Sequence, residues 1–187
     1  MTETDANDLV FRVIAEESVT ADLDHRIRDT LVACFPADAA HFSRSRSWHS
    51  RPAWVVVALA PDGSVAAHCA MVERRVVIHG KGALTVAGVQ GFSVMPDWRR
   101  SGLSDRIMER AIEEMRRRGI EAGLLFCLPE LEKVYVRTGW RRIKAAATMR
   151  DESGNPAPLP EKNITMAIPV TIPAFPRGDI DLMGPDW

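Results

Sequence analysis

Residues 88–115 read GVQGFSVMPDWRRSGLSDRIMERAIEEM, and the spacing of apolar residues changes within this stretch. Up to Val94 the residues continue an apolar strand pattern. From Leu103 the apolar residues recur every three or four positions, as they do on one face of a helix. Between the two patterns lies the segment Arg99–Ser104, which has the spacing R-x-x-G-x-small. The sequence therefore predicts a strand, a short loop and an amphipathic helix in direct succession.

The loop at Arg99–Ser104 carries the residues expected of a phosphate site. Gly102 allows a tight turn, and the free N–H groups of the first helical turn attract an anion. Arg99 and Arg100 add positive charge that suits phosphate oxygens. A loop that only caps the helix would look similar, so the phosphate interpretation depends on the strand before the loop and the helix after it.

The chain before this segment predicts one helix and several strands. Apolar residues at spacings of three and four favour a helix over residues 20–36, ended by Pro36. Residues 37–52 are polar and predict a long loop or one weak helix. Gly88 and Gly91 interrupt the third strand of a β region and indicate a bulge or a close backbone approach. The predicted strands here are residues 8–19, 53–60, 64–78 and 83–94.

The chain after residue 102 predicts a helix at 103–118, a strand at 123–128, a helix at 129–139 and strands at 140–150 and 164–170. This order predicts an α/β (α+β) fold. Its central sheet would be mixed and mostly antiparallel, with six to seven strands and helices on both faces. We expect a single domain over residues 1–187, with a core at about 8–170. The Pro-rich C-terminal tail, 171–187, lies outside that core.

Composition excludes several classes of function. The 187 residues hold 24 basic and 25 acidic side chains, so the net charge is −1. This balance argues against nucleic-acid binding and against a polybasic membrane anchor. The three cysteines are far apart, which favours reduced thiols and predicts no metal site. The acidic, polar start resembles no signal peptide, and the longest apolar run, 53–60, is too short to span a bilayer. We expect a cytoplasmic protein.

The element order and the segment at Arg99–Ser104 resemble the GNAT superfamily of acyl-CoA-dependent N-acyltransferases. In that family the loop after the fourth strand carries Q/R-x-x-G-x-G/A and binds the CoA pyrophosphate. The resemblance covers residues 8–170 and is most specific at 86–140. It implies acetyl-CoA or another acyl-CoA as co-substrate. The implied CoA-binding residues of the loop are Arg99, Arg100, Ser101, Gly102, Leu103 and Ser104. Ser104 departs from the pattern, but its small side chain should preserve the turn.

Two families within the superfamily look most similar. The stretches VAAHCAMVERRVVIHG, VQGFSVMPDWRRSGL and VYVRTGW resemble aminoglycoside 2′-N-acetyltransferases. The stretches RSWHSRP, DGSVAAH, VMPD and the ending FPRGDIDLMGPDW resemble the rhizobial nodulation N-acyltransferases. Both families acylate an amino sugar. The resemblance therefore implies a small-molecule amine as the acceptor, with no nucleic acid and no membrane partner, and it leaves a homodimer open.

The resemblance also implies roles for particular residues. A backbone N–H at a strand bulge polarises the thioester carbonyl in this family, and the bulge is expected at Phe92, Ser93 and Val94. The pantetheine arm of CoA would pair with this strand. Tyr135 begins the pattern Y-x-x-x-G-W, whose tyrosine often protonates the leaving thiolate. The alternative for Tyr135 is an aromatic ring packed on the sheet.

The general base is not assigned. The acetyltransferase relatives suggest Glu at Gln90, and an amide cannot accept the proton of an ammonium group. Gln90 and Gly91 are instead expected at the substrate, where Gln90 would orient a water or bind a hydroxyl. The other candidates are Glu73, His68 and His41. A relayed water, or binding of an amine that is already neutral, remains an alternative.

Further alternatives stay open. Residues 41–52 form either a mobile lid over the acceptor cleft or a solvated loop held by Trp48. Cys127 lies in an apolar strand and is expected to be an inert thiol. The leading function is N-acyl transfer from CoA to an amine. The competing functions are transfer of a long acyl chain from acyl carrier protein, and CoA binding without catalysis.

Overall fold

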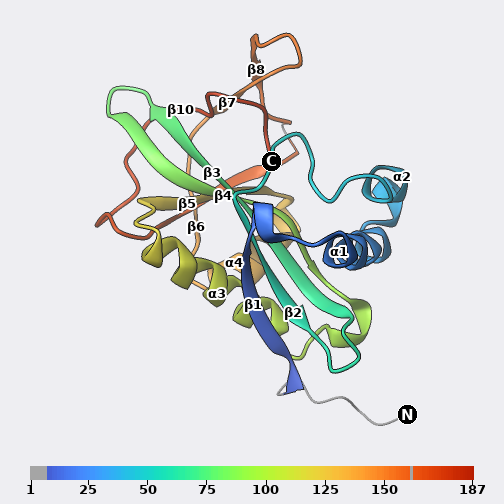
Figure 1. Cartoon of the computed structure of the whole chain (residues 1–187). Helices are drawn as coiled ribbons and strands as arrows, with labels where there is room; N and C mark the ends of the chain where they lie inside the picture. Colours follow the sequence, from blue (N-terminus) through green and yellow to red (C-terminus); the bar gives the residue numbers. More distant parts are fainter. Residues whose placement is uncertain (1–7, 161) are drawn as a thin grey trace.

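The computed structural model describes residues 8–160 and 162–187, and Figure 1 shows a curved sheet between helices. Four helices are present in this part of the chain, and short 3-10 turns at 16–18, 36–38, 96–98 and 129–131 precede or follow them. The helices are α1 (Ala21–Cys34), α2 (Ala39–Phe42), α3 (Leu103–Arg117) and α4 (Glu132–Val136).

The described residues contain ten strands in one sheet, and two neighbouring pairs, β4–β5 and β7–β10, are parallel. All other paired neighbours are antiparallel, which confirms the mixed, mostly antiparallel sheet. The strands are β1 (Val10–Ala15), β2 (Trp54–Leu59), β3 (Val65–Ile78), β4 (Gly82–Val94), β5 (Ala122–Cys127), β6 (Arg141–Arg142), β7 (Ala147–Arg150), β8 (Pro156–Pro158), β9 (Ile164–Pro169) and β10 (Ile180–Asp181).

The strand count exceeds the expected six to seven because short strands escape sequence patterns. The predicted strand at 140–150 is divided into β6 and β7, and the predicted loop at 151–160 contains β8. These strands have two to four residues, too few for an alternating pattern to be recognised. The predicted helix at 129–139 is likewise shorter, because its first turn is a 3-10 turn and α4 ends at Val136.

Helices cover both faces of the sheet, as the sequence predicts. Val56 and Ala58 of β2 pack in the same cluster as Ile107 of α3, whereas Val55 of β2 packs in a cluster with α1. Because successive strand residues point to opposite faces, α1 and α3 lie on opposite sides of the sheet (Figure 1). The two faces of β4 are therefore screened by different helices.

The sheet opens between β4 and β5. The two strands are paired only from Val86 to Gly88 on β4 and from Ala122 to Leu124 on β5. Both strands then continue, β4 to Val94 and β5 to Cys127, without further pairing to each other. Parallel strands that part in this way leave a wedge between them, and this wedge is the feature that positions the site below.

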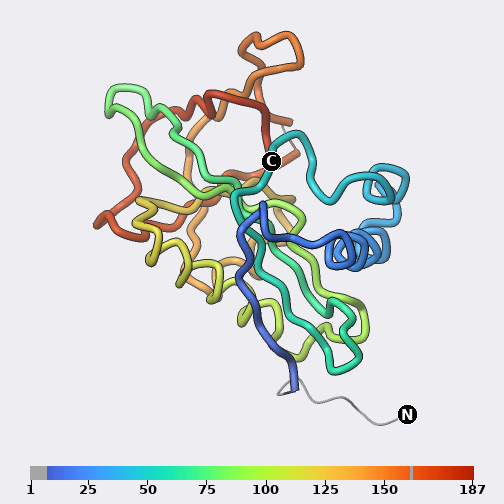
Figure 2. The backbone as a smooth tube through the Cα atoms, in the orientation of Figure 1, coloured from blue at the N-terminus to red at the C-terminus, as the bar shows by residue number. Residues whose placement is uncertain are grey.

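The C-terminal tail packs into the sheet, which differs from the expected core boundary at residue 170. Figure 2 traces the tail back to the middle of the molecule. Ile180 of β10, Leu182 and Trp187 are buried there. The Trp187 ring lies on Gly88, where a Cβ would come within 2.1 Å of a ring atom, and the Arg74 guanidinium lies over the ring at 5.3 Å from its centroid. Only glycine at residue 88 leaves room for this ring.

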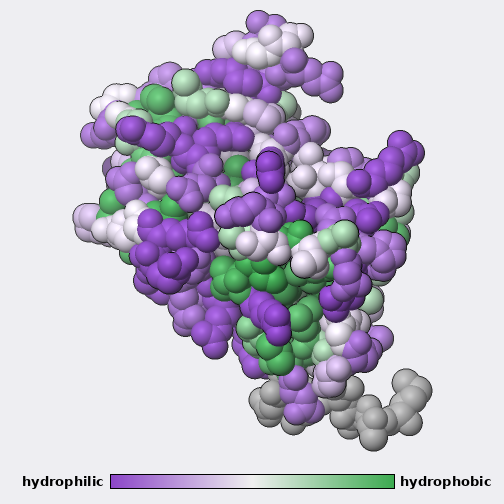
Figure 3. Space-filling model, in the orientation of Figure 1, coloured by the Kyte–Doolittle hydropathy of each residue, from purple (hydrophilic) through white to green (hydrophobic). Residues whose placement is uncertain are grey.

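Hydrophobic surface is visible where β1 crosses the front of the molecule (Figure 3). Val10 and Val13 of β1 are among the exposed large apolar side chains. Neither residue lines the cavity described below. Within the described residues no helix is long and apolar enough to cross a membrane.

Candidate active site

A cavity of about 460 Å³ lies beside the part of β4 that no longer pairs with β5. Its walls come from the end of β4, the loop before α3, the end of α1 and the segment around α4. The lining residues are Cys34, Phe35, Phe92, Ser93, Val94, Trp98, Arg99, Arg100, Ser104, Leu131, Val134 and Tyr135. The structure thus brings together most of the residues that the sequence assigns to CoA binding and catalysis.

The end of β4 contains the expected bulge, one residue earlier than predicted. Ser93 pairs with His68 and Gln90 pairs with Ala70, so two residues of β4, Gly91 and Phe92, lie opposite a single residue of β3. Gly91 has φ +57°, a left-handed value that favours glycine. The irregularity therefore falls at Gly91 and Phe92 rather than within 92–94, and Phe92 is common to both ranges.

His68 lies on β3 directly beside this bulge. The imidazole is fully buried, and its Nδ1 lies 2.9 Å from the carbonyl oxygen of Gly91. Burial lowers the pKa of His68 to about 4, against a smaller upward effect of the Gly91 carbonyl. The ring is therefore neutral near pH 7, and it is not poised to accept a proton there.

The loop between β4 and α3 has the shape expected of an anion site. Arg100 has φ 65°, and Gly102, the residue that caps the N-terminus of α3, has φ 78°. No atom lies within 4 Å of the position that a Cβ of Gly102 would occupy. Ser101 closes the turn through a 2.7 Å hydrogen bond from its Oγ to the Trp98 carbonyl. The start of α3, the positive end of the helix dipole, thus lies beside an open turn.

The loop residues differ in what they present to this space. The side chains of Arg99, Arg100 and Ser104 line the cavity. Leu103 is buried in the core, so only its backbone is available to a ligand. Ser101 and Gly102 are exposed at the turn and are not among the residues that line the cavity.

Arg137 is a residue at this site that the sequence reasoning missed. Its guanidinium pairs with Asp105 in the first turn of α3 at 2.8 Å and donates to the Ser104 hydroxyl at 3.1 Å. The pair neutralises an acidic side chain next to the loop at Arg99–Ser104, where a free carboxylate would repel an anion. The two partners are 32 residues apart in the chain, so no local pattern could have joined them.

Tyr135 lies at the inner wall of the cavity. It is buried, and its ring packs 5.6 Å from the ring of Phe92 and 6.3 Å from that of Trp140. Burial raises the pKa of the Tyr135 hydroxyl well above its usual range. The phenol therefore stays protonated at neutral pH and can donate a proton. The ring packs in the core and Tyr135 also lines the cavity, so the packing alternative is observed and the proton-donor role stays a prediction.

Gln90 has partners other than those expected. Its Oε1 accepts the backbone N–H of Trp48 at 3.0 Å, and its Nε2 donates to the carbonyl of Ser50 at 2.7 Å. Both ends of the amide are thus used to hold the segment 48–50 against β4. Neither Gln90 nor Gly91 lines the cavity, so their proposed contact with substrate stays a prediction.

The candidates for a general base do not converge on the cavity. Glu73 is exposed on β3, and His41 lies 2.8 Å from the Ser47 carbonyl with its ring stacked on Trp48. His68 is held at the bulge, as described above. None of these three residues is among the lining residues. The structure therefore does not identify any of these three residues as the general base.

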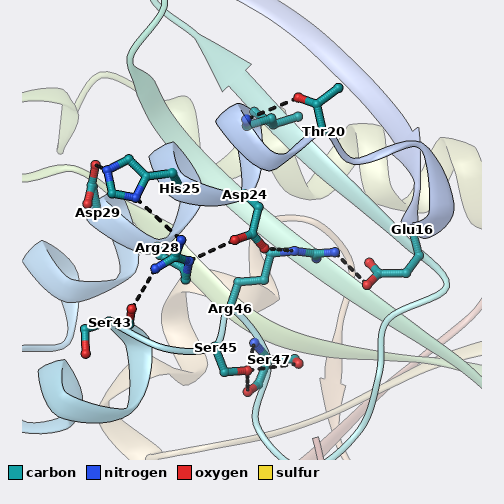
Figure 4. Close-up of polar contacts among 11 residues, drawn as sticks. Glu16, Thr20, Asp24, His25, Arg28, Asp29, Ser43, Ser45, Arg46 and Ser47 are labelled. Atoms are coloured by element: carbon teal, nitrogen blue, oxygen red, sulfur yellow. Dashed lines mark hydrogen bonds and ion pairs between the residues drawn. The ribbon is translucent and has the colours of Figure 1, made fainter.

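The segment after α2, residues 43–50, is tied down at several points (Figure 4). Arg46 pairs with Glu16 at 2.6 Å and with Asp24 of α1 at 2.9 Å. Arg28 of α1 donates to the Ser43 carbonyl at 2.6 Å (Figure 4). Trp48 packs on Phe42, with 4.6 Å between ring centroids. Of the two alternatives, these contacts favour an anchored loop over a mobile lid.

Of Cys34 and Cys127, only Cys34 is among the lining residues of the cavity. Burial raises the pKa of Cys127 to about 11, as expected of an inert thiol. Cys34, at the end of α1, lines the cavity. Burial raises the pKa of its thiol, and Arg99 offsets part of that rise. Among the residues that the structure describes, no group of His, Cys, Asp and Glu side chains is placed to hold a metal ion.

Comparison with known proteins identifies a family and a fold. A family model described as an acetyltransferase (GNAT) domain matches residues 17–143. The GNAT family N-acetyltransferase YhbS of Escherichia coli, solved with CoA, has a TM-score of 0.62 at 17% identity. That alignment covers 94% of this chain and 89% of that chain. No curated protein matches the sequence.

Two further solved structures share the fold. An acyl-CoA N-acyltransferase from Pseudomonas aeruginosa has a TM-score of 0.61 at 15% identity, with coverage of 85% of this chain and 98% of that chain. The ribosomal-protein-S18-alanine N-acetyltransferase from Escherichia coli has a TM-score of 0.57 at 16% identity, with coverage of 88% and 97%. Identities this low establish a common fold and do not transfer a substrate.

Proposed function

Since this chain belongs to the GNAT acetyltransferase family, we propose that it transfers an acyl group from a CoA thioester to the primary amine of a small molecule. The observation that carries the proposal is the wedge between β4 and β5. The cavity beside the unpaired part of β4 is lined by Arg99 and Arg100 of the loop before α3 and by the buried Tyr135. A ligand with a diphosphate and a reactive thioester suits these groups.

The proposed binding mode assigns each part of the cavity to a part of CoA. The turn at Arg99–Ser104 receives the pyrophosphate, since it combines two arginines with the N-terminus of α3. The pantetheine arm runs along Phe92–Val94, where β4 has no partner on the β5 side. The thioester then lies near the bulge. A related fold solved with CoA supports CoA as the co-substrate.

The proposed reaction is direct transfer. The amine nitrogen attacks the thioester carbon, and the carbonyl oxygen gains negative charge that a backbone N–H of the bulge stabilises. The C–S bond then breaks, and Tyr135 gives its proton to the departing sulfur. The amine nitrogen loses one proton to solvent, so the charge balances once the phenol is reprotonated.

The amine must be neutral before it attacks. An amine with a pKa near 10 is mostly protonated at pH 7, and freeing its lone pair costs about 4 kcal/mol. Because none of the candidate bases lines the cavity, we propose that the neutral amine is taken directly from solution. The rate should then rise with pH toward the pKa of the free amine.

The acceptor that we propose is an amino sugar. This choice rests on the stretches that resemble aminoglycoside 2′-N-acetyltransferases and nodulation N-acyltransferases, such as VQGFSVMPDWRRSGL. We also propose that the protein is cytoplasmic, where acyl-CoA is made and used.

The test is a matrix of donors and acceptors followed by thiol release. Acetyl-CoA, longer acyl-CoAs and acyl carrier protein thioesters are each combined with amino sugars, amino acids and polyamines. We expect turnover with a short acyl-CoA and an amino sugar. Turnover with acyl carrier protein alone would identify the long-chain alternative. Calorimetric binding of CoA without turnover on any amine would identify a CoA-binding protein that lacks catalysis.

A further inference from the structure

We propose that His68 is a positioning residue, which orients the backbone N–H of Phe92 toward the thioester carbonyl. This inference rests on the proposed function. In it, a buried side chain of β3 holds the oxyanion donor of β4 in place. His68 does not touch substrate in this account. It acts through the peptide bond between Gly91 and Phe92.

The geometry of the bulge carries the inference. His68 Nδ1 lies 2.9 Å from the Gly91 carbonyl oxygen, and the described part of the chain has no cis peptide bond. In a trans peptide the carbonyl and the following N–H point in opposite directions. The Phe92 N–H is therefore turned away from the His68 ring. Phe92 lies on the part of β4 that has no β5 partner, beyond Gly88, and it lines the cavity.

The hydrogen bond fixes the proton on one nitrogen of the ring. A carbonyl oxygen only accepts, so the neutral imidazole carries its proton on Nδ1. Nε2 is buried and has no hydrogen-bond partner among the residues that the structure describes. The ring is thus committed to a single polar contact, and that contact is with the bulge. A buried polar atom without a partner is costly, so packing alone does not account for a histidine at this position.

Gly91 and His68 are matched to each other. A Cβ at residue 91 would lie 3.3 Å from His68 Cε1 and 3.4 Å from Leu31 Cδ2. A side chain there would press on the imidazole and on α1, and the φ of +57° is itself unfavourable for other residues. The absence of a side chain at Gly91 lets the ring approach the carbonyl. The peptide is consequently held from one side by His68 and left open on the other.

The experiment compares two substitutions at His68. His68→Leu removes the donor, whereas His68→Asn places its Nδ2 about where Nδ1 stands and retains a donor. Thr30→Val is the matched control, because Thr30 Oγ1 makes a buried hydrogen bond from α1 to the Val65 carbonyl at 2.9 Å, away from the bulge. Binding of acetyl-CoA is measured by calorimetry for each protein. The carbonyl stretch of bound [1-¹³C]acetyl-CoA is then measured by isotope-edited infrared spectroscopy, which needs no acceptor amine.

We expect the bound carbonyl stretch to lie below that of free acetyl-CoA in wild type, in His68→Asn and in Thr30→Val. In His68→Leu it should return toward the free value while the affinity for acetyl-CoA changes little. The kcat of His68→Leu should fall roughly 10- to 100-fold. This fall is no larger than the one expected when an oxyanion donor is deleted outright. His68→Asn should recover most of that loss.

A measurement on wild type keeps the proposal testable if His68→Leu does not fold. In protein labelled with ¹⁵N-phenylalanine, the Phe92 amide resonance should differ between the CoA and acetyl-CoA complexes, because only acetyl-CoA carries the thioester carbonyl. An unchanged resonance, or an unchanged carbonyl stretch in a folded His68→Leu protein that binds acetyl-CoA, overturns the inference about His68. Failure of wild type to bind acetyl-CoA would instead overturn the proposed function.

Discussion

Tyr135 is buried and lines the cavity. Because burial raises its pKa, the phenol does not ionise ahead of the reaction. In the proposed mechanism it gives up its proton as the C–S bond breaks. Tyr135→Phe keeps the ring and removes that proton. We expect kcat to fall about 10²- to 10⁴-fold, with an unchanged Kd for CoA by calorimetry. A variant that keeps most of its kcat would leave Tyr135 with packing alone.

His68 makes stability depend on pH. Its pKa is about 4 in the folded protein and about 6.5 when the chain is unfolded. Between these values the unfolded chain binds the proton and the folded protein does not, so stability falls as the pH falls from 6.5 toward 4. From pH 7 to pH 5 the free energy of unfolding should drop by about 2 kcal/mol on this account.

Urea unfolding of wild type and His68→Asn at both pH values checks this effect. The other titrating groups are common to both proteins and cancel in the comparison. The asparagine variant should lose about 2 kcal/mol less than wild type between pH 7 and pH 5. Equal losses in the two proteins would mean that folding does not change the pKa of His68.

At the scale of single elements, α3 begins and ends with glycines of similar conformation. Gly102 at its start has φ 78° and Gly119 after its end has φ 71°, and neither has an atom within 4 Å of a Cβ position. Valine at either position meets the same backbone strain, about 1–2 kcal/mol. Only the valine at residue 102 would stand in front of the helix N-terminus at the proposed pyrophosphate site.

Gly102→Val and Gly119→Val therefore form a matched pair. Both variants should unfold at similar urea concentrations. Calorimetry should show CoA binding lost in Gly102→Val and retained in Gly119→Val. If the two variants bind CoA equally, the pyrophosphate does not lie at the start of α3.

The elements that the sequence predicts well are those with local patterns. Helix α3 follows from its apolar stripe, and it begins at Leu103 as expected. The bulge in β4 could be anticipated from Gly91, but its position depends on pairing with His68, which is 23 residues away. The partners of Gln90 lie 40 and 42 residues away. Site geometry that depends on such long-range contacts cannot be predicted from a local sequence pattern.

At the scale of the whole molecule, the tail completes a second hydrophobic cluster. Trp187 packs with Val72, Val86 and Leu124, which belong to three different strands. The proline-rich composition of 171–187 suggested a tail outside the core, because prolines interrupt helix and strand patterns. Composition could not reveal that the indole ring fits over Gly88. Fold class was thus predictable, and the extent of the core was not.

Removal of this ring should destabilise the protein. Trp187→Ala leaves a cavity over Gly88, and the free energy of unfolding should fall by about 3–5 kcal/mol. Met183→Ala, a substitution in the same tail at a side chain that is 54% exposed, should change it by no more than about 0.5 kcal/mol. Urea unfolding of both variants measures the difference. Similar values for the two would mean that the tail does not stabilise the sheet in solution.

The parting of β4 from β5 has a consequence for local unfolding. Between Val89 and Val94, β4 is an edge strand inside the molecule, with the hydrogen-bonding groups of one side left to solvent or ligand. A pantetheine arm in the gap would act as a surrogate strand. Amide hydrogens at Phe92 and Val94 should then exchange with deuterium faster in the free protein than in the CoA complex. The bound co-substrate would thus complete the hydrogen bonding along the free edge of β4. These hydrogen bonds would form anew each time CoA binds.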